Sequence, residues 1–422
     1  MSSLTRTFTT AAVVVSFALC AGVPAQAADP VRIGVLYPLT GPAAQPGNDS
    51  LAAAKLALDI VNNAHNLDLP LARTEGLPNL GGAKVEFIVA DHQGKPEVGR
   101  GEAERLVTNE KVSALFGAYH SSVSAVASLV GERYQVPFLT GESSSPQLHT
   151  RGLKWFFRTG PHDGHYTRTM FDFIRDYGKR TGKQFKTAAI IYEDTQFGVD
   201  SARVQVELAK EAGIEVLENI SYRARTTSLI AEVQRLKAAN ADILFPTAYT
   251  ADALLLMRTM KELDYAPTLL IAQNAGFNDA SFLETIGQGA NDVISRSPFS
   301  MDMADKIPLI GQLNALYKTH SGGRDIYDPP IRTFVGMYVL LDAINRAGSA
   351  DPAKIRAALQ ATNLPSGAIP MPWQDIRFSA QGQNEGVSTV LIQVQGGQYW
   401  SIYPFDVAAR EVMFPFKPWS AR

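Results

Sequence analysis

The sequence predicts an α/β protein of two lobes, each built on a parallel sheet covered by helices. Short apolar runs rich in β-branched residues alternate with segments of helical apolar spacing. This alternation is typical of right-handed βαβ units in a parallel sheet. The same alternation starts again near the middle of the chain with unrelated sequence. The length of 422 residues also favours two domains.

The first lobe is predicted from four strands and the helices that follow them. The expected strands are Val31–Leu36, Lys84–Ala90 and the apolar parts of Val112–Gly117 and Val136–Thr140, and the expected helices are Leu51–Asn62, Pro96–Glu110 and Val123–Tyr134. The segment Leu67–Gly82 is rich in Leu, Pro and Gly without clear periodicity. We expect this segment to be an exposed loop or a small lid.

The second lobe is predicted from a series that starts after Phe156–Pro161. Its expected strands are Thr187–Tyr192, Ile214–Ser221, Ile243–Tyr249 and Thr268–Ala272, and its expected helices are Tyr166–Arg180, Ser201–Ala212, Ser228–Ala239 and Ala251–Leu263. The end of the chain is less regular. Helices are expected at Pro308–His320, Thr333–Ala347 and Asp351–Leu359, followed by a hairpin of Gly386–Val394 and Tyr399–Tyr403. The tail beyond Asp406 is expected to pack along the surface.

Residues 1–27 have the pattern of a secretory signal peptide. Arg6 precedes the apolar stretch Ala11–Ala21, and Ala25–Ala27 forms a small-x-small cleavage site. The apolar stretch is too short to span a bilayer. Cys20 is the only cysteine, and Leu19 stands before it where lipid attachment needs a small residue. We therefore expect a mature chain that begins near Ala28, without a lipid anchor and without disulfide or thiol chemistry.

Charge and motifs exclude several functions. The net charge of −2 favours neither nucleic acid nor an acidic membrane surface. The sequence has no Gly-x-Ser-x-Gly nucleophile elbow and no phosphate loop. His162, Asp163 and His165 are interpreted as polar residues of a hinge, because no further His or Cys cluster completes a set of metal ligands. We therefore expect no enzymatic activity, no metal and no cofactor.

Two strand-to-turn junctions are the strongest functional signal. Val112–Ser122 and Val136–Pro146 each begin as an apolar run, break at a glycine and then present serines. Ligands of open parallel sheets bind beyond the carboxyl ends of the strands, where free N–H groups of the next helix attract anions. The pair is therefore expected to hold one carboxylate through serine hydroxyls and main-chain amides, without a fixed cation. Taken alone, each serine run is more simply a helix N-cap.

Six segments carry a resemblance to a known family, in matching order and spacing. They are Gly34–Pro42, Gly117–Ser122, Thr140–Pro146, Phe157–Thr159, Asp194–Gly198 and Asp351–Ile355. On these residues the chain resembles the leucine/isoleucine/valine-type periplasmic solute-binding proteins of ABC importers. The resemblance implies the type I periplasmic binding protein fold, with two Rossmann-like lobes joined by three hinge crossovers. It also implies a monomer in the periplasm that delivers a small molecule to an ABC permease of the inner membrane.

The resemblance further implies the lobe boundaries. The N-terminal lobe is expected to comprise 28–158 and 297–367, the C-terminal lobe 159–296 and 368–405, and the tail 406–422. The crossovers are expected near Arg158–Pro161, Ser295–Pro298 and Ser366–Pro372.

Site residues also follow from the resemblance. It assigns the carboxylate of the ligand to the first-lobe turns, at Ser121, at the backbone of Glu142 and at Ser144. Ser143, in the same turn, is a further candidate. Phe197 and Tyr249 of the second lobe are implied to close over the ligand. Tyr37 and Tyr119 end strands, and they line the cleft or belong to the core. The last candidate is His120, which directly precedes Ser121.

One position departs from the amino-acid-binding members. They place an acidic residue after the strand that corresponds to Thr268–Ala272, where it pairs with the α-ammonium, and this chain has Asn274. An amide supplies no charge to compensate a desolvated cation. The ligand is therefore an amino acid, branched-chain or aromatic, or else an amine-free aromatic or aliphatic acid or a short amide. Glu142 supplies the missing acid if its side chain turns inward. A periplasmic sensor subunit and a secreted enzyme are the alternative roles.

Overall fold

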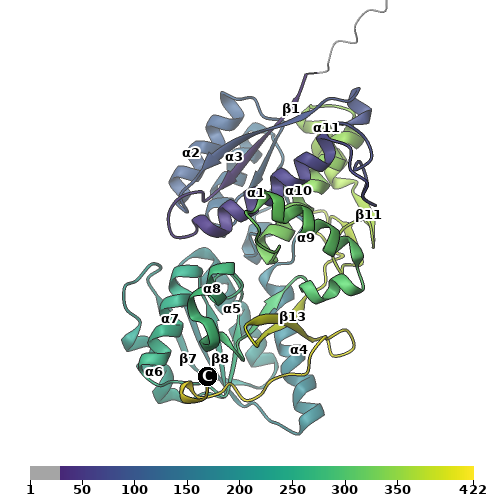
Figure 1. The fold of residues 1–422 in the computed structure, drawn as a ribbon. Helices are drawn as coiled ribbons and strands as arrows, with labels where there is room; N and C mark the ends of the chain where they lie inside the picture. Colours follow the sequence, from purple (N-terminus) through teal and green to yellow (C-terminus); the bar gives the residue numbers. More distant parts are fainter. Residues whose placement is uncertain (1–28) are drawn as a thin grey trace, which may run out of the picture.

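The computed structural model describes residues 29–422, which form two lobes stacked one on the other (Figure 1). The predicted signal peptide and Cys20 lie outside these residues. Each lobe has its own sheet with helices packed on it, as the sequence predicts. Within 29–422, none of the helices combines the length and the apolar character that crossing a membrane requires.

The sheet of the first lobe has five parallel strands in the order β2-β1-β3-β4-β5. The strands are β1 (Val31–Tyr37), β2 (Val85–Asp91), β3 (Ala114–Gly117), β4 (Phe138–Thr140) and β5 (Phe156–Arg158). Nearly every side chain of β1 is buried, because helices cover both faces of a parallel sheet. The helices that contact the sheet are α1 (Ala44–Asn62), α2 (Pro96–Thr108), α3 (Ser121–Tyr134) and α10 (Asp328–Ala347). Two more, α9 (Pro308–His320) and α11 (Pro352–Gln360), pack on α1 and α10 respectively.

The sheet of the second lobe has seven strands in the order β14-β13-β10-β9-β8-β6-β7. Its parallel strands are β6 (Thr187–Glu193), β7 (Glu215–Tyr222), β8 (Ile243–Thr247), β9 (Leu269–Ala272) and β10 (Ile294–Ser297). The antiparallel edge is the predicted hairpin, β13 (Val390–Gln395) and β14 (Gln398–Tyr403). The helices are α4 (Asp163–Thr181), α5 (Gln196–Glu211), α6 (Ile230–Ala239), α7 (Thr250–Glu262) and α8 (Ala280–Ile286).

The chain passes from one lobe to the other after β5, returns after β10 to add α9 and α10 to the first lobe, and crosses again before β13. Before the last passage, β11 (Asn363–Pro365) pairs antiparallel with β12 (Asp375–Arg377). Ile369, Met371 and Trp373 between them pack in the same apolar cluster as β1, α1 and α10. The lobe boundaries stay a prediction, and these contacts favour a third crossover nearer to β13 than Ser366–Pro372.

The interpretation of Leu67–Gly82 as an exposed loop is wrong. Leu67, Leu69 and Leu77 are buried in the first-lobe core, and the hydroxyl of Tyr338 on α10 donates to the carbonyl of Pro70. The segment includes the 3-10 helix Pro78–Leu80. Its apolar residues lack periodicity because they pack singly beneath α10 and not along one face of a helix. The segment is therefore a loop whose apolar residues belong to the core, while polar residues such as Arg73 and Glu75 are exposed.

Other irregular segments lie between the main elements or after them. The remaining 3-10 helices are Pro146–His149, Gly287–Ala290, Met301–Asp305 and Trp419–Ala421. The tail packs on the second lobe, where Phe416 is buried and Trp419 Nε1 donates to the carbonyl of Tyr265 at 2.7 Å. Figure 1 shows the end of the chain at the outer end of that lobe.

Candidate functional site

The two serine turns lie side by side at the carboxyl edge of the first sheet. Ser121 begins α3 after β3, Ser143–Ser145 follow β4, and β3 and β4 are neighbours. The backbone N–H of Ser145 donates to Ser121 Oγ at 3.3 Å. No serine hydroxyl caps α3 or the 3-10 helix Pro146–His149, so the capping interpretation does not account for these serines.

The serines after β4 make different contacts. Ser143 is bound within the first lobe, through Ser124 Oγ at 2.7 Å and the carbonyl of Tyr119 at 3.2 Å. Ser144 faces the second lobe, because its carbonyl accepts the N–H of Asp163 at 2.8 Å. Ser145 Oγ meets α5, where it accepts from Gln196 Nε2 at 3.3 Å and donates to the carboxylate of Asp200. Ser144 and Ser145 therefore join the lobes, whereas Ser143 stabilises the turn.

Arg296 is a fixed cation beside the serine turns, and the expectation of a site without one is wrong. Its Nη2 lies 3.4 Å from Ser144 Oγ and 3.3 Å from Asp163 Oδ1, and its side chain is 2 % exposed. Its Cζ lies 3.6 Å from the centroid of the Tyr166 ring. Sequence reasoning missed Arg296 because it treated Ser295–Pro298 as a crossover, whereas Ile294–Ser297 forms β10. The sequence offers one signal for Arg296, because a charged residue stands there between two small residues, Ser295 and Ser297, at the end of a strand.

Glu142 is held by the first lobe. Its Oε1 accepts from Tyr37 Oη at 2.8 Å and from Thr333 Oγ1 on α10, while Arg332 Nη1 donates to its carbonyl at 2.6 Å. Burial raises the pKa of the Glu142 carboxyl, and the hydrogen bond from Thr333 opposes that shift. Burial and the nearby Glu142 also raise the pKa of Tyr37 well above its ordinary value. Tyr37 is thus a buried partner of Glu142.

Asn274 lies where both lobes meet. It follows β9 with a φ of 69°, and its amide donates to Asp328 Oδ2 on α10 and to the carbonyl of Arg296 at 3.1 Å. The other oxygen of Asp328 accepts from Arg332 Nε. An aspartate at position 274 would face Asp328 in a buried setting, where two like charges raise each other's pKa. The neutral amide at this position is therefore explained by Asp328.

An aromatic cluster of Tyr119, His120, Phe197 and Tyr249 bridges the lobes. The Tyr249 ring lies 5.5 Å from Tyr119, 4.6 Å from His120 and 5.3 Å from Phe197, measured between centroids. Tyr119 and His120 come from the turn after β3, whereas Phe197 lies in the first turn of α5 and Tyr249 precedes α7. Burial lowers the pKa of His120 well below 6.5, and His92 and Arg225 add to the shift. The His120 ring is therefore neutral at pH 7.

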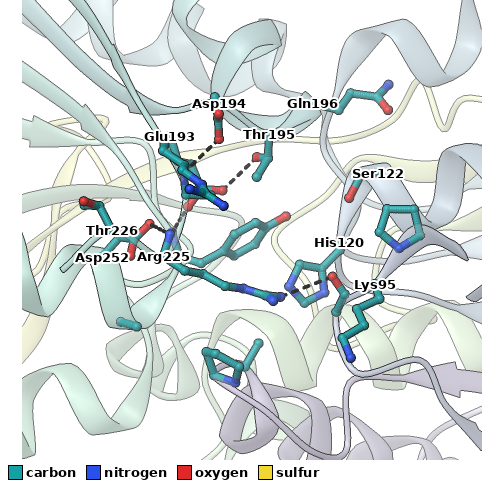
Figure 2. Close-up of a pocket in the computed structure, with 18 of the residues that line it drawn as sticks. Lys95, His120, Ser122, Glu193, Asp194, Thr195, Gln196, Arg225, Thr226 and Asp252 are labelled. Atoms are coloured by element: carbon teal, nitrogen blue, oxygen red, sulfur yellow. Dashed lines mark hydrogen bonds between the residues drawn. The ribbon is translucent and has the colours of Figure 1, made fainter. Parts of the chain in front are cut away.

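A cavity of about 820 Å³ lies beside this cluster, between the lobes (Figure 2). Lys95, His120 and Ser122 line it from the first lobe, and Glu193 and Asp252 are among the residues of the second lobe that face it. Burial raises the pKa of Glu193 to about 8, although the N–H of Tyr249 at 3.0 Å and the hydroxyl of Thr195 favour the carboxylate.

Arg225 spans this cavity. Its Nη2 donates to the carbonyl of Gly94 in the first lobe at 3.3 Å, and its N–H donates to Asp252 Oδ2 at 2.9 Å (Figure 2). Gly94 has a φ of 68°, and a Cβ there would lie 2.8 Å from Arg225 Nη2. The positive φ favours glycine at this position, whereas the end of the flexible Arg225 side chain can move aside for a Cβ.

The two histidines of the His162–His165 segment stabilise the start of α4, whereas Asp163 between them takes part in the junction of the lobes. The two imidazoles stack with centroids 3.7 Å apart, and His162 accepts the N–H of Gly164 at the start of α4. Asp163 pairs with Arg296, a role that the sequence did not reveal. In the part of the chain that the structure describes, no three His, Cys, Asp or Glu side chains gather closely enough to hold a metal ion.

Two α/β lobes with polar and aromatic side chains from both at their junction define a two-lobed binding protein. The chain belongs to the periplasmic binding protein family, whose model matches residues 30–398. This confirms the resemblance found in the sequence. The chain is also similar to Leu/Ile/Val-binding protein homolog 7 of Brucella suis, with 26% identity over 403 residues, 94% of this chain and 97% of the relative.

Solved structures share the fold. A leucine-binding protein of Thermotoga maritima has a TM-score of 0.75 and 21% identity, covering 89% of this chain and 100% of its own. An ABC-transporter solute-binding protein of Rhodopseudomonas palustris, in complex with 3,4-dihydroxybenzoic acid, has a TM-score of 0.73 and 19% identity, covering 93% of this chain and 100% of its own. These likenesses confirm the predicted fold class.

Proposed function

We propose that the mature chain is the periplasmic solute-binding component of an ABC importer. It captures a small solute that bears a carboxylate, and the two lobes close around that solute. The family supports a binding role without turnover, and the solute-binding protein of Rhodopseudomonas palustris supports the link to an ABC transporter. In this proposal the chain acts as a monomer, reaches the periplasm through the signal peptide and delivers its solute to a permease.

The observation that carries this proposal is the junction at Ser144 and Ser145. Side chains from two independently folded sheets meet there, at the carboxyl edge of the first sheet. A solute that contacts both faces binds the closed arrangement better than the open one and shifts the population toward it. Ser121, Ser144, Phe197, Tyr249 and Asn274 are the proposed ligand contacts.

The relatives and structural neighbours point to two classes of solute. The name of the Brucella suis relative and the leucine-binding protein of Thermotoga maritima point to amino acids. The Rhodopseudomonas palustris protein binds an aromatic acid without an amine. Both classes carry a carboxylate, which suits the serine turns of this chain.

A thermal-shift screen tests the proposal. The mature protein is unfolded and refolded to remove bound solute, and is then heated with amino acids, their deaminated acids, benzoate-type acids and short amides. A compound that binds only the native state raises the melting temperature by mass action. We expect carboxylates to raise it, to be recovered intact and to reduce the radius of gyration in X-ray scattering. A screen in which no carboxylate stabilises the protein would contradict the proposal.

A further inference from the structure

The buried acids and the buried arginines at the junction differ in how many of their polar atoms are already bound. In Asp328, one oxygen accepts from Arg332 and the other from Asn274. In Asp163, Oδ1 accepts from Gln273 Nε2 at 3.2 Å and Oδ2 from Ser201 Oγ at 2.9 Å. Neither aspartate keeps an oxygen free of hydrogen bonds.

The acids on the second-lobe side are bound in the same way. The two oxygens of Glu193 accept from Thr195 Oγ1 and from the N–H of Tyr249. Those of Asp279 accept from Thr250 Oγ1 and from Ser281. An ammonium group that entered this junction would therefore find every one of these carboxylate oxygens already accepting a hydrogen bond and would share it with the bound donor.

Glu142 is the exception among these acids. Its Oε2 has no hydrogen-bond partner within residues 29–422. The carboxyl group is nevertheless fixed by Tyr37 and Thr333 through Oε1. Burial raises its pKa, which disfavours the charged form that an ammonium needs. Glu142 is therefore poorly suited to replace the acid that amino-acid-binding members place at position 274.

The arginines show the opposite pattern. Nε and Nη1 of Arg296 have no hydrogen-bond partner in the described chain, although Nη1 lies 3.7 Å from Asp328 Oδ2. Nη2 of Arg158 likewise has none among residues 29–422. Arg296 is 2 % exposed, and a buried donor without an acceptor is unfavourable. The planar guanidinium matches the two oxygens of a carboxylate.

We infer that the solute is an organic carboxylate without an ammonium group, and that Arg296 beside Ser144 determines this specificity. The inference rests on the proposed function and narrows its solute. The carboxylate of the solute binds the free donors of Arg296 together with the hydroxyl of Ser144.

Matched pairs of compounds test the inference on the unaltered protein. The pairs are leucine with 4-methylpentanoate, phenylalanine with 3-phenylpropanoate, and benzamide with benzoate, each titrated by calorimetry. We expect binding by the acids and at least a tenfold weaker affinity for the amine-bearing or amide partner of each. Tighter binding of the amino acids overturns the inference and leaves the proposed function standing. Binding by no carboxylate of either series overturns both.

Variants of Arg296 test its role. Arg296→Gln is expected to weaken binding of the acids by about tenfold or more, the scale of a lost hydrogen bond to a charged group. Arg296→Lys keeps a positive charge next to Asp163 and Asp328 but loses the planar guanidinium that matches both oxygens of a carboxylate. We therefore expect a smaller loss of affinity for the acids than in Arg296→Gln. If Arg296→Gln does not fold, Arg296→Lys and the compound pairs decide the question. An acid affinity unchanged in Arg296→Lys and in any folded Arg296→Gln assigns Arg296 a structural role only.

Arg422→Gln is the matched control. Arg422 is also 2 % exposed, lies 3.8 Å from the carboxylate of Asp292 and stacks on Phe416 at 3.4 Å, but it belongs to the tail. Its loss is expected to lower stability without changing the affinity for acids. The reciprocal variant, Asn274→Asp, adds a carboxylate at the junction and is expected to weaken binding of the acids. Unchanged acid affinity in that variant would remove Asn274 from the site.

Discussion

Two of the places where the lobes meet, an inner junction and an outer cavity, pair their charges differently. At the inner junction, formed by Ser144, Asp163, Arg296 and Asp328, the charged side chains are at most 2 % exposed and are bound to one another across the lobes. At the outer cavity of Figure 2, charges of both signs face an open space, and Arg225 donates a hydrogen bond to the first lobe.

The difference shows where selectivity arises. A charge that is removed from water must find compensation in the protein or in the solute, so the inner junction accepts few chemical groups. The exposed cations of the outer cavity, Lys95, Arg223 and Arg225, stay hydrated, and their interactions are weak and screened by salt. The inner junction should therefore determine which solute binds, and the outer cavity should tune how firmly the lobes stay closed.

The largest expected effect is that of Asp328→Ala on stability. Removing this carboxylate leaves Arg332 and Arg296 buried beside an apolar methyl group, and breaking such a pair typically lowers the free energy of unfolding by about 3–5 kcal/mol. The control is Asp342→Ala on the same helix, where Asp342 pairs with Arg346 at the same four-residue spacing but with the arginine 34 % exposed. Denaturant unfolding of both variants would contradict the comparison if they lost equal stability.

The next effect concerns Ser144 and Ser143. Ser144→Ala should weaken carboxylate binding by about 1–2 kcal/mol, because its hydroxyl contributes a hydrogen bond to a charged group. Ser143→Ala should lower the melting temperature and leave affinity nearly unchanged, since the Ser143 hydroxyl bonds within the first lobe. Calorimetry and thermal melts of the two variants measure both quantities. Equal affinities would place Ser144 outside the ligand contacts.

The third effect is a pH dependence from Glu193. Its pKa in the folded protein is raised to about 8, above the ordinary value of about 4.3, so the folded state holds a proton that the unfolded state has lost. Between these values, stability should fall as pH rises, by up to about 1.4 kcal/mol per pH unit from this group. Unfolding of Glu193→Gln from pH 5 to 9 should lack this slope.

Glu262→Gln, at the exposed end of α7, is the control for loss of a carboxylate in that experiment. An unchanged slope in Glu193→Gln would show that the Glu193 carboxyl is not protonated in the folded protein near neutral pH.

The smallest effect is that of Arg225→Ala at the outer cavity. The bond from Arg225 to the carbonyl of Gly94 is partly exposed, so its loss should reduce solute affinity by no more than about 1 kcal/mol. Arg223→Ala is the control, because Arg223 also lines the cavity but donates no hydrogen bond to the first lobe within residues 29–422. If Arg225→Ala reduced solute affinity as much as Ser144→Ala, the inner junction and the outer cavity would not differ in their contribution to binding.

Local patterns in the sequence predicted the fold. Strands that alternate with helices, and serines that follow a strand, depend on neighbouring residues, and the structure contains these elements near the expected positions. The prediction of an exposed loop at Leu67–Gly82 failed because its isolated apolar residues show no helical or strand periodicity, although they are buried against α10.

Local patterns in the sequence could not predict the inner junction. Asp163, Arg296 and Asp328 lie far apart in the sequence, and each is unremarkable in its own segment. Their importance arises only when the chain has crossed between lobes and buried them together. Asn274 was found as a departure from related sequences, but its cause, the nearby Asp328, needed the structure.

The tail fixes the end of the chain to the second lobe, through Trp419 and through Arg422, whose Nη1 donates to the carbonyl of Gly289 at 2.8 Å. The first described strand begins at the opposite end of the molecule (Figure 1). Fluorescent donor and acceptor groups attached near these two ends would therefore sit on different lobes. Because residues 29–422 contain no cysteine, each label can be directed to a single introduced thiol. Energy transfer between the labels would then report solute capture in real time, without any change to the site itself.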